Sequence, residues 1–342
     1  MPTQPRVVKV TGNLKNYPWG RKNGLTEFKV LASENPQAEL WFGNHPAGPS
    51  FEVTTGEPLA TVPAFPLLVK ILAIGKPLSI QVHPNQNFAE QNFEKLKLSD
   101  KNGKDEILIA LETVRAFAGI KSDNVRSQVA KSFQLNSFDK DFLSQCNEIF
   151  NLSKNQIEEK LTLLQNSFSD DAERQVFSDL VKSYPNDPGV LVASLLQFHE
   201  LSPGEGLHVP PGCPHEYLSG LAIEVMTNSD NVFRMGLTNK PIDRDNSLKV
   251  LGDESFTRFP AGGTYKPRAS FEVKLLHDTS YQVAKCDYQV LLCLTGTAVF
   301  DSQKQKYSLA PGEALLISGE ITGDLVVTGR ATVAIHREDG RL

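Results

Sequence analysis

The sequence has little that would tie it to a nucleic acid or a membrane. Its 342 residues include 35 Lys and Arg against 40 Asp and Glu, a formal net charge of −5, so it lacks the basic excess typical of nucleic-acid binding. No apolar run reaches the roughly 18 residues of a membrane span. The N-terminus, MPTQPRVVKV, has no apolar stretch long enough for a secretory signal. We therefore expect no nucleic-acid or membrane partner and a cytoplasmic location.

Cysteine is also scarce, and its spacing excludes one class of metal site. The four cysteines show no close CxxC pairing: Cys146, Cys213, Cys286 and Cys293. They indicate reduced thiols rather than a disulfide framework or a thiolate zinc site. Any metal in this protein is therefore expected to be bound by histidine and carboxylate side chains.

The pattern of apolar residues predicts a mainly β protein with a helical interruption. Short strand-like runs broken by Gly, Pro and Asn fill the first 120 residues, among them LLVKILAI and EILIAL. The periodicity is helical from about residue 122 to 199, where Ser153 and Gln156 have the spacing of a capping box. The run GVLVASLLQF is expected to continue this block as a helix that begins at Pro188. Strand-like sequence then returns and continues to the C-terminus.

One internal similarity concerns a turn between two strand-like runs. LSPGEGLHVPPG, residues 201–212, resembles LAPGEALLISGE, residues 309–320. Pro-Gly turns recur in any all-β sheet, so the match can be coincidental. The alternative is that the chain contains two related β-barrel domains.

The first of these two segments continues into a recognisable spacing. Gly204, Pro210, Gly212 and His215 have the spacing of the second cupin motif, with Ser219 at its final Asn position. Such a segment enters a small barrel through a hairpin and directs a histidine into the barrel mouth. A lone histidine is more often a hydrogen-bonded structural residue than a metal ligand, so other residues have to decide its role.

Polar side chains at the ends of two further strand-like runs favour a metal site. Gln81 and His83 in SIQVHPNQ are two apart and therefore lie on the same face of a strand. Glu106 begins the apolar run that follows NGKD. With His215 these residues would give two nitrogen and two oxygen ligands, a set that suits zinc. The alternative is a hydrogen-bonded pair inside the protein, and the spacing alone leaves both open.

A third segment, IEVMTNSDNVFRMGLTNKPID at residues 223–243, brings further charged side chains near His215 in the sequence. It contains Glu224, Arg234 and Lys240 around a Ser-Asp-Asn loop. The segment is either a solvated loop or part of the same barrel mouth. Arg234 could pair with Asp230, or it could place a positive charge beside a substrate.

Several motifs in a fixed order resemble the type I phosphomannose isomerase family, which interconverts mannose 6-phosphate and fructose 6-phosphate with a bound zinc ion. The motifs are NYPWG, ELWFGNHPAGPS, QVHPN, the K-x-E of GKDE, PHEYLSG and SDNVFRMGLTNK. The resemblance runs from about residue 16 to 243, with a plausible fit of the β tail to the C-terminal barrel of the family.

The resemblance implies a role for each matching residue. It implies one Zn²⁺ ion per chain, held by four ligands: Gln81, His83, Glu106 and His215. It implies catalytic roles for Arg234 and Lys104, and the residues expected to bind a sugar-phosphate substrate are Lys70, Ser79, Tyr217 and Lys240. Glu224 is a candidate base, because a carboxylate in a closed mouth can have a raised pKa.

The repeated Pro-Gly-Glu turn around a helical block predicts the domain organisation, and the comparison with the family motifs shows two departures. We expect two cupin (jelly-roll β-barrel) domains with an α-helical insertion domain: residues 1–121 and 200–266 catalytic, 122–199 helical, and 267–342 C-terminal and cupin-like. No obligate protein partner is evident. Gly103 stands where the family often has histidine, and Asp105 where it often has proline. The carboxylate of Asp105 is expected to repel an anionic substrate.

Two other functions remain open from the sequence. One is a different metal-dependent cupin enzyme, and the other is a non-catalytic cupin that binds a sugar phosphate. Arg234 and Lys104 beside a complete ligand set favour catalysis, whereas Gly103 slightly favours its loss.

Overall fold

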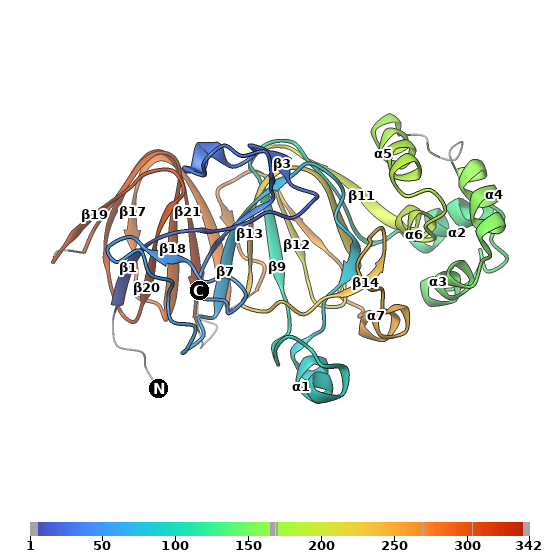
Figure 1. Ribbon diagram of the computed structural model, residues 1–342, viewed down its shortest axis with the longest axis horizontal. Coiled ribbons are helices and arrows are strands. Elements are labelled where there is room, and N and C mark those ends of the chain that lie inside the picture. Colours follow the sequence, from blue (N-terminus) through green and yellow to red (C-terminus); the bar gives the residue numbers. More distant parts are fainter. Residues whose placement is uncertain (1–5, 165–167, 169, 269, 303, 338–342) are drawn as a thin grey trace.

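A computed structural model of the chain describes residues 6–164, 168, 170–268, 270–302 and 304–337. Two β-sheets lie side by side along the molecule, and a group of helices lies at the outer end of one of them (Figure 1). The expectation of a mainly β, cupin-like fold with a helical insertion is confirmed.

The sheet next to the helices has eleven strands and contains the candidate site. Its main path runs β15-β12-β9-β13-β7-β5-β2, with β8, β10, β11 and β14 attached beside it. The strands are β2 (Asn13–Lys15), β5 (Glu39–Phe42), β7 (Leu67–Ile74), β8 (Ile80–Val82), β9 (Glu106–Ala110), β10 (Val114–Ile120), β11 (Leu196–Leu201), β12 (Gly206–Val209), β13 (His215–Thr227), β14 (Phe233–Gly236) and β15 (Thr257–Phe259).

The central strands of this sheet are buried on both faces, which explains their nearly continuous apolar runs. In β7, Leu67, Val69 and Ile71 pack into the core shared with the second sheet. Leu72 and Ile74 lie on the opposite face, in a separate cluster. The charged residues of the candidate site occupy this second face, so alternation along each strand directs them inward.

The second sheet has eight strands and includes the beginning of the chain. Its strands are β1 (Arg6–Thr11), β6 (Phe51–Glu52), β16 (Thr264–Tyr265), β17 (Phe271–Val283), β18 (Tyr288–Asp301), β19 (Lys306–Leu309), β20 (Glu313–Ser318) and β21 (Gly323–His336). Strand β1 lies within residues 1–121, which were expected to be catalytic, and it pairs antiparallel with β20 of this sheet. Val8 and Val10 of β1 are buried in the core between the sheets, and this burial accounts for its position. A separate short ribbon joins β3 (Arg21–Lys22) to β4 (Pro36–Gln37), and a 3₁₀ turn, η1 (Thr26–Phe28), lies between them.

The two similar turns in the sequence have the same local structure. Gly204 and Gly312 both have positive φ angles, 87° and 79°, which favour glycine. The carboxylate that follows each glycine closes its own turn: Glu205 accepts a hydrogen bond from the amide of Ser202 at 2.7 Å, and Glu313 accepts one from Ala310 at 2.8 Å. The similarity is therefore one of geometry as well as of letters.

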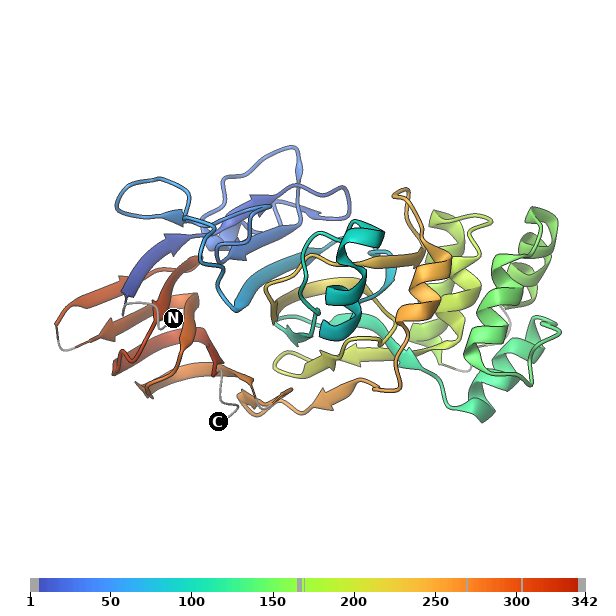
Figure 2. The same ribbon diagram turned by 90° about the horizontal axis from the view of Figure 1, so that it is seen from below.

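The helical insertion forms a core of its own against the first sheet (Figure 2). Its helices are α2 (Asp123–Ser132), α3 (Phe142–Phe150), α4 (Lys154–Leu164), α5 (Asp171–Ser183) and α6 (Gly189–Ser194). The predicted capping box is confirmed, because the Ser153 amide donates to the Gln156 side chain at 2.9 Å and the Gln156 amide donates back to the Ser153 hydroxyl at 3.4 Å.

The predicted helical block ends too late, at residue 199. Helix α6 stops at Ser194, and the next residues form strand β11, which pairs with β10. In the run GVLVASLLQF, a buried helix and a buried strand are equally apolar, so periodicity could not separate them.

Two helices were not predicted, α1 (Gln86–Leu96) and α7 (Arg244–Val250), and they lie beside each other in both ribbon views (Figures 1 and 2). Each begins at a side-chain cap, with Asn85 accepting from the Phe88 amide and Asp243 from the Asn246 amide. In α1 only Ala89 is fully buried, and Phe88 and Leu96 pack against the core of the helical insertion from partly buried positions.

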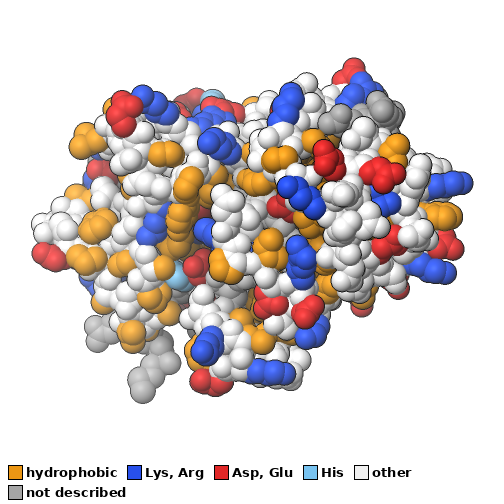
Figure 3. Space-filling view, turned by 45° about the vertical axis from the view of Figure 1, so that its right-hand side comes forward, with side chains coloured by type: hydrophobic (Ala, Val, Ile, Leu, Met, Phe, Trp, Pro, Cys, Tyr) orange, Lys and Arg blue, Asp and Glu red, His pale blue; other side chains and the backbone are white. Residues whose placement is uncertain are grey.

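Charges of both signs are mixed over the described surface on the face shown in Figure 3. Within the described residues, no helix is both long and apolar enough to cross a bilayer.

Candidate metal centre and active site

Strand β8 lies between β13, which begins at His215, and β14, which contains Arg234. Gln81 is directly opposite His215 of β13 on one side and Arg234 of β14 on the other. This register explains why the short strand SIQVH ends in polar residues. It brings together side chains from three distant parts of the sequence.

Three of the four predicted ligands meet at one buried point. One ligand atom from each of His83, Glu106 and His215 lies within 4.8 Å of the other two. Nε2 of His83 lies 3.3 Å from Oε2 of Glu106, and Nε2 of His215 lies 3.2 Å from Oε1. Gln81, the fourth predicted ligand, is in register beside His215 and lines the adjacent cavity.

The outer nitrogens of both imidazoles are already hydrogen-bonded, and this leaves the inner ones available as ligands. Nδ1 of His83 lies 2.9 Å from the carbonyl of Asn231, and Nδ1 of His215 lies 2.9 Å from the carbonyl of Cys213. Because a carbonyl only accepts, each Nδ1 carries the proton and each Nε2 has a free lone pair. Among the described residues, both Nε2 atoms and Oε2 of Glu106 are buried without a hydrogen-bond partner. Unsatisfied buried acceptors that converge in this way fit a divalent cation.

The ionisation of these groups also suits a cation. Burial lowers the pKa of His83 to about 3, with the nearby Lys104 ammonium acting in the same direction. Burial opposes a charge on Glu106, but Lys104 and the two imidazoles outweigh it and hold the pKa of this carboxyl well below its usual range. The site therefore offers a neutral His83 imidazole and a Glu106 carboxylate near neutral pH, the forms that bind zinc.

Glu106 is held from two sides. The Tyr217 hydroxyl donates to Oε1 at 2.7 Å, and Lys104 Nζ forms an ion pair with Oε2 at 3.0 Å, outside hydrogen-bond geometry. Tyr217 is fully buried behind the carboxylate and is not among the residues lining the cavity. Its predicted substrate-binding role stays a prediction, and its observed contact is with a metal ligand.

A cavity of about 610 Å³ adjoins these ligands. It contains every other predicted site residue: Lys70, Ser79, Gln81, Lys104, Glu224, Arg234 and Lys240. Residues that were not predicted also line it, and the aromatic and charged ones among them are Tyr17, Trp19, Glu39, Trp41, Lys76, Tyr184 and Asp230. The helical insertion contributes Tyr184 to the wall, so the cavity joins the β-sheet to the inserted helices.

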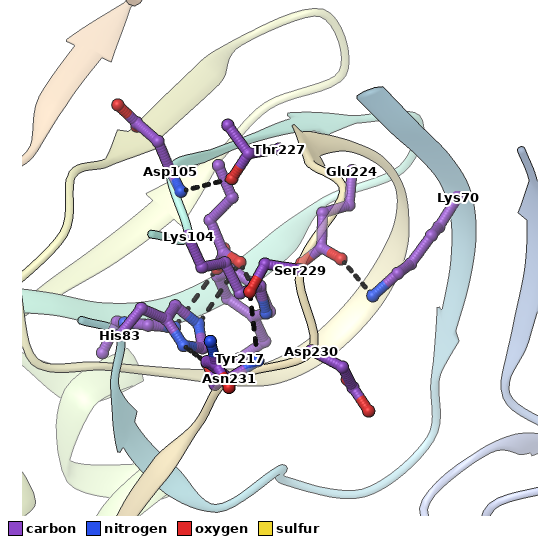
Figure 4. A network of polar contacts seen from close by, with 12 residues as sticks. Lys70, His83, Lys104, Asp105, Tyr217, Glu224, Thr227, Ser229, Asp230 and Asn231 are labelled. Atoms are coloured by element: carbon purple, nitrogen blue, oxygen red, sulfur yellow. Dashed lines mark hydrogen bonds and ion pairs between the residues drawn. The ribbon is translucent and has the colours of Figure 1, made fainter. Parts of the chain in front are cut away.

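Lys70 and Glu224 form a buried ion pair on one wall (Figure 4). Their strands place them directly opposite each other, and Nζ of Lys70 lies 3.0 Å from Oε2 of Glu224. Glu39 lies 3.8 Å from the same ammonium, and Trp41 stacks beneath it at 4.8 Å. Burial raises the pKa of Glu224 against the lowering by Lys70. Burial likewise disfavours the Lys70 ammonium, but Glu224 and Glu39 more than offset this and raise its pKa.

Sequence reasoning missed the roles of Glu39 and Trp41, although it noted their motif, ELWFGNHP. The indole N–H of Trp41 donates to the Glu39 carboxylate. The sequence did contain a signal for this pair. Glu39 and Trp41 are two apart in a strand-like run, so both side chains fall on the same face of β5.

The expectation that Asp105 repels an anionic substrate is wrong. Its side chain points away from His83 (Figure 4) and lies 2.6 Å from Nε2 of His208 and in an ion pair with Arg268. Alternation along the chain turns Asp105 outward because Lys104 and Glu106 point inward.

Gly103 also has a structural explanation. A Cβ atom at this position would lie 2.5 Å from the backbone nitrogen of Gln86, so the loop before Lys104 packs directly against the start of α1. A larger residue would push these backbones apart.

Comparisons with known proteins point to one family. Residues 7–123 match the family model for the catalytic domain of type I phosphomannose isomerase. The chain is 30% identical to the mannose-6-phosphate isomerase of Salmonella typhimurium, over 91% of this chain and 95% of that protein. It is 27% identical to the enzyme of Rattus norvegicus, over 97% and 98% of the two chains.

Solved structures give the same result. The apo form of mannose 6-phosphate isomerase from Salmonella typhimurium has a TM-score of 0.84 at 26% identity, covering 97% of this chain and 99% of that one. A zinc-bound mannose 6-phosphate isomerase has a TM-score of 0.83 at the same identity and coverage. With similarity in both sequence and fold extending over nearly the whole length, this chain belongs to the type I phosphomannose isomerase family.

Proposed function

We propose that this protein is a zinc-dependent isomerase that interconverts mannose 6-phosphate and fructose 6-phosphate. The observation that carries the proposal is the convergence of His83, Glu106 and His215, with unsatisfied ligand atoms, beside a cavity that contains several cations. The four buried cysteines, all unpaired, support a working location in the reducing cytoplasm.

Zinc fits the donor set of this site. His83, Glu106 and His215 would hold the ion, with the Gln81 amide oxygen as a fourth donor, and this leaves room for an exchangeable position. When bound, the ion supplies a Lewis acid that polarises the oxygens of the sugar and stabilises negative charge on them.

The side chains of the cavity supply the proton transfers that the reaction needs. Conversion of an aldose to a ketose removes a proton from C2, returns one to C1, and moves another between the two oxygens. Glu224 is the candidate base at carbon, because burial raises the pKa of its carboxyl and makes it a better proton acceptor. Lys104 is suited to hold or move the proton at oxygen, since it reaches the cavity beside Glu106.

Arg234 is suited to stabilise charge rather than to transfer a proton. Its guanidinium stays protonated at any working pH. Arg234 lines the cavity, and strand β8 lies between its strand and that of His215. It has no ion pair within the described part of the chain, and the alternative pairing with Asp230 is not formed within 4.0 Å. A positive charge that is not already paired can respond fully to an oxyanion.

The charges of the cavity suggest where the phosphate binds. Lys70 is balanced by Glu224 and Glu39, so this wall has no net positive charge to offer a dianion. Lys76 and Lys240 line the same cavity without an ion-pair partner among the described residues. Both adjoin the segment Tyr17–Trp19, because the Lys76 amide donates to the Trp19 carbonyl and the Lys240 ammonium stacks on Tyr17.

We therefore assign the phosphate group to the end of the cavity near Lys76, Lys240 and the Ser79 hydroxyl. Ser79 and Lys240 are among the residues that were expected from the sequence to bind the substrate. The family resemblance links Lys70 to phosphate binding together with Ser79, whereas this assignment leaves Lys70 to the sugar end of the cavity. Free cations are required because the protein as a whole is acidic.

A coupled assay tests the proposed function directly. The purified protein is given mannose 6-phosphate, mannose or glucose 6-phosphate, and the product is followed with and without a chelator. We expect fructose 6-phosphate from mannose 6-phosphate alone and loss of the activity on chelation. A metal-loaded protein that binds mannose 6-phosphate without turning it over would instead be a non-catalytic binding protein.

A further inference from the structure

We propose that Asp100 and Asn231 form a clamp that positions the metal centre and the arginine strand together. Neither residue lines the cavity, so both would act as positioning residues. The inference rests on the proposed zinc site, but it concerns contacts within the chain and can be tested through metal binding alone.

The Asn231 side chain uses its whole hydrogen-bonding capacity within the protein. Its carbonyl oxygen accepts from the amides of Ser99 at 2.9 Å and Asp100 at 3.4 Å. Its amide group donates to the backbone carbonyls of Asp100 at 2.8 Å and Asn102 at 2.9 Å. The residue is only 1% exposed, so losing these bonds would leave buried polar groups unsatisfied.

The Asp100 carboxylate closes the clamp from the other side. One oxygen accepts from the Ser229 hydroxyl at 2.9 Å and from the Asn231 amide group at 3.1 Å. The other oxygen accepts from the backbone amide of Asp230 at 3.0 Å. Hydrogen bonds to an ionised acceptor are stronger than those between neutral groups, so the loop of residues 228–231 is tied firmly to residues 99–102.

The clamp joins segments that lead into the site, and its Asn231 lies beside His83 (Figure 4). Residues 99–103 lead directly into Lys104 and Glu106. Residues 229–231 lead into strand β14 and Arg234. The backbone carbonyl of Asn231 accepts a hydrogen bond from the Nδ1–H group of His83 and thereby sets which nitrogen faces the metal.

This arrangement gives the clamp a specific consequence. If the Asn231 peptide rotates, the His83 imidazole loses the bond that orients it, and Asp230 and Arg234 move with the same loop. Partners of this kind on a metal-binding histidine typically affect metal affinity or activity by about 10- to 100-fold. The clamp thus couples metal affinity to the position of a charge that acts on the substrate.

The variant Asp100→Asn tests the clamp with almost no change in size. The neutral amide keeps the shape but cannot accept at both ends, so it loses part of the bonding to Ser229, Asp230 and Asn231. We expect its zinc dissociation constant, measured by chelator competition, to rise about tenfold or more. At saturating zinc we expect kcat to fall by a similar factor while KM changes little, because the loss concerns the alignment of Arg234. Asp139→Asn, at an exposed aspartate of the helical insertion, is the matched control and should change neither quantity.

A second readout reports on geometry rather than on activity. Cobalt substituted into the wild-type and Asp100→Asn proteins should give different visible spectra, because the orientation of His83 changes. Hydrogen exchange of the wild-type protein should show slower exchange at the Asp230 and Asn231 amides when zinc is bound, and this experiment does not require the variant to fold.

Three results would overturn the clamp: wild-type zinc affinity and kcat in a folded Asp100→Asn protein, an unchanged cobalt spectrum, or exchange at residues 230–231 that does not respond to zinc. Weakened zinc binding in a protein that turns out not to isomerise mannose 6-phosphate would leave the clamp intact and refute the proposed function.

Discussion

The ammonium group of Lys70 lies between two carboxylates, whereas that of Lys76 has no ion pair within the described residues. This difference separates two kinds of cation in one cavity. A paired cation preserves the alignment of its neighbours, and removing it leaves buried charges uncompensated. A free cation attracts an anionic ligand at little structural cost.

The free cation gives a prediction about substrate binding. Lys76→Gln should raise KM for mannose 6-phosphate several-fold, and the effect should shrink at high salt, because an exposed charge is screened. Its kcat and zinc content should stay close to wild type. Lys70→Gln is the informative comparison, and it should mainly lower kcat and stability. An unchanged KM in Lys76→Gln, with a large KM effect in Lys70→Gln, would return the phosphate to Lys70.

Arg234 gives a prediction about turnover. Arg234→Ala should keep its fold and its zinc but lose about 10²-fold or more in kcat, as is usual when one preorganised donor to a developing charge is removed. Lysine should restore only part of the loss because it lacks the planar guanidinium. Steady-state kinetics beside a zinc analysis makes the test. Near-normal turnover in a folded, zinc-loaded Arg234→Ala protein would reduce Arg234 to a structural residue.

The residues of the candidate metal centre could be predicted from the sequence, whereas some of their partners could not. His83 and His215 follow from strand alternation and motif spacing. The orientation of Asp105 could not be seen in the sequence, because its partners His208 and Arg268 are 103 and 163 positions away and no local pattern connects them. The same holds for Asn231, whose function depends on where its backbone carbonyl points.

Strands and helices differ in how well the sequence defines them. The long strands β7, β9 and β13 were predictable because burial on both faces makes them strongly apolar. Helix α1 was not predicted although Phe88 and Leu96 pack against the core of the helical insertion, and β11 was missed because a helix and a strand meet inside one apolar run. In each case the surroundings of the element, rather than its own composition, decide its structure.

Strand β11 contains His199, which gives a prediction about stability and pH. Burial lowers the pKa of His199 to about 4, and its Nε2 lies 3.1 Å from the carbonyl of Ala118. In the unfolded chain a histidine titrates near 6.5. Between these values the unfolded state binds more protons, so the stability falls as the pH drops from about 6.5 to 4.

The variant His199→Gln should remove this contribution, because an amide can donate to Ala118 without titrating. We expect the loss in unfolding free energy between pH 7.5 and pH 4.5 to be smaller in the variant. If the pKa shift of His199 acted in full, it would contribute roughly 3 kcal/mol to the change in unfolding free energy with pH. Denaturant melts at the two pH values measure it, and parallel pH dependence in both proteins would show that His199 does not contribute.

At the scale of the whole molecule, the two sheets share one hydrophobic core, which includes Val8 and Val10 from the N-terminal strand. Strand β1 therefore belongs to the second sheet, and the chain continues from it into β2 of the eleven-stranded sheet. Sequence patterns predicted the two β regions and the helical insertion, because each differs in periodicity. They did not predict that β1 would pair with β20 in the second sheet, since pairing between residues some 300 positions apart is set by the core and not by local pattern.

We propose that a single zinc centre formed by Gln81, His83, Glu106 and His215 supports the isomerisation of mannose 6-phosphate. Titration of zinc into the chelator-treated protein, with the rate of fructose 6-phosphate formation followed at each addition, tests it most directly. We predict that activity rises from near zero in proportion to added zinc and levels off at one ion per chain, and that His215→Ala does not recover at that stoichiometry. Full activity in the metal-free protein, or recovery of His215→Ala with one zinc ion per chain, would show that this zinc centre does not support the reaction.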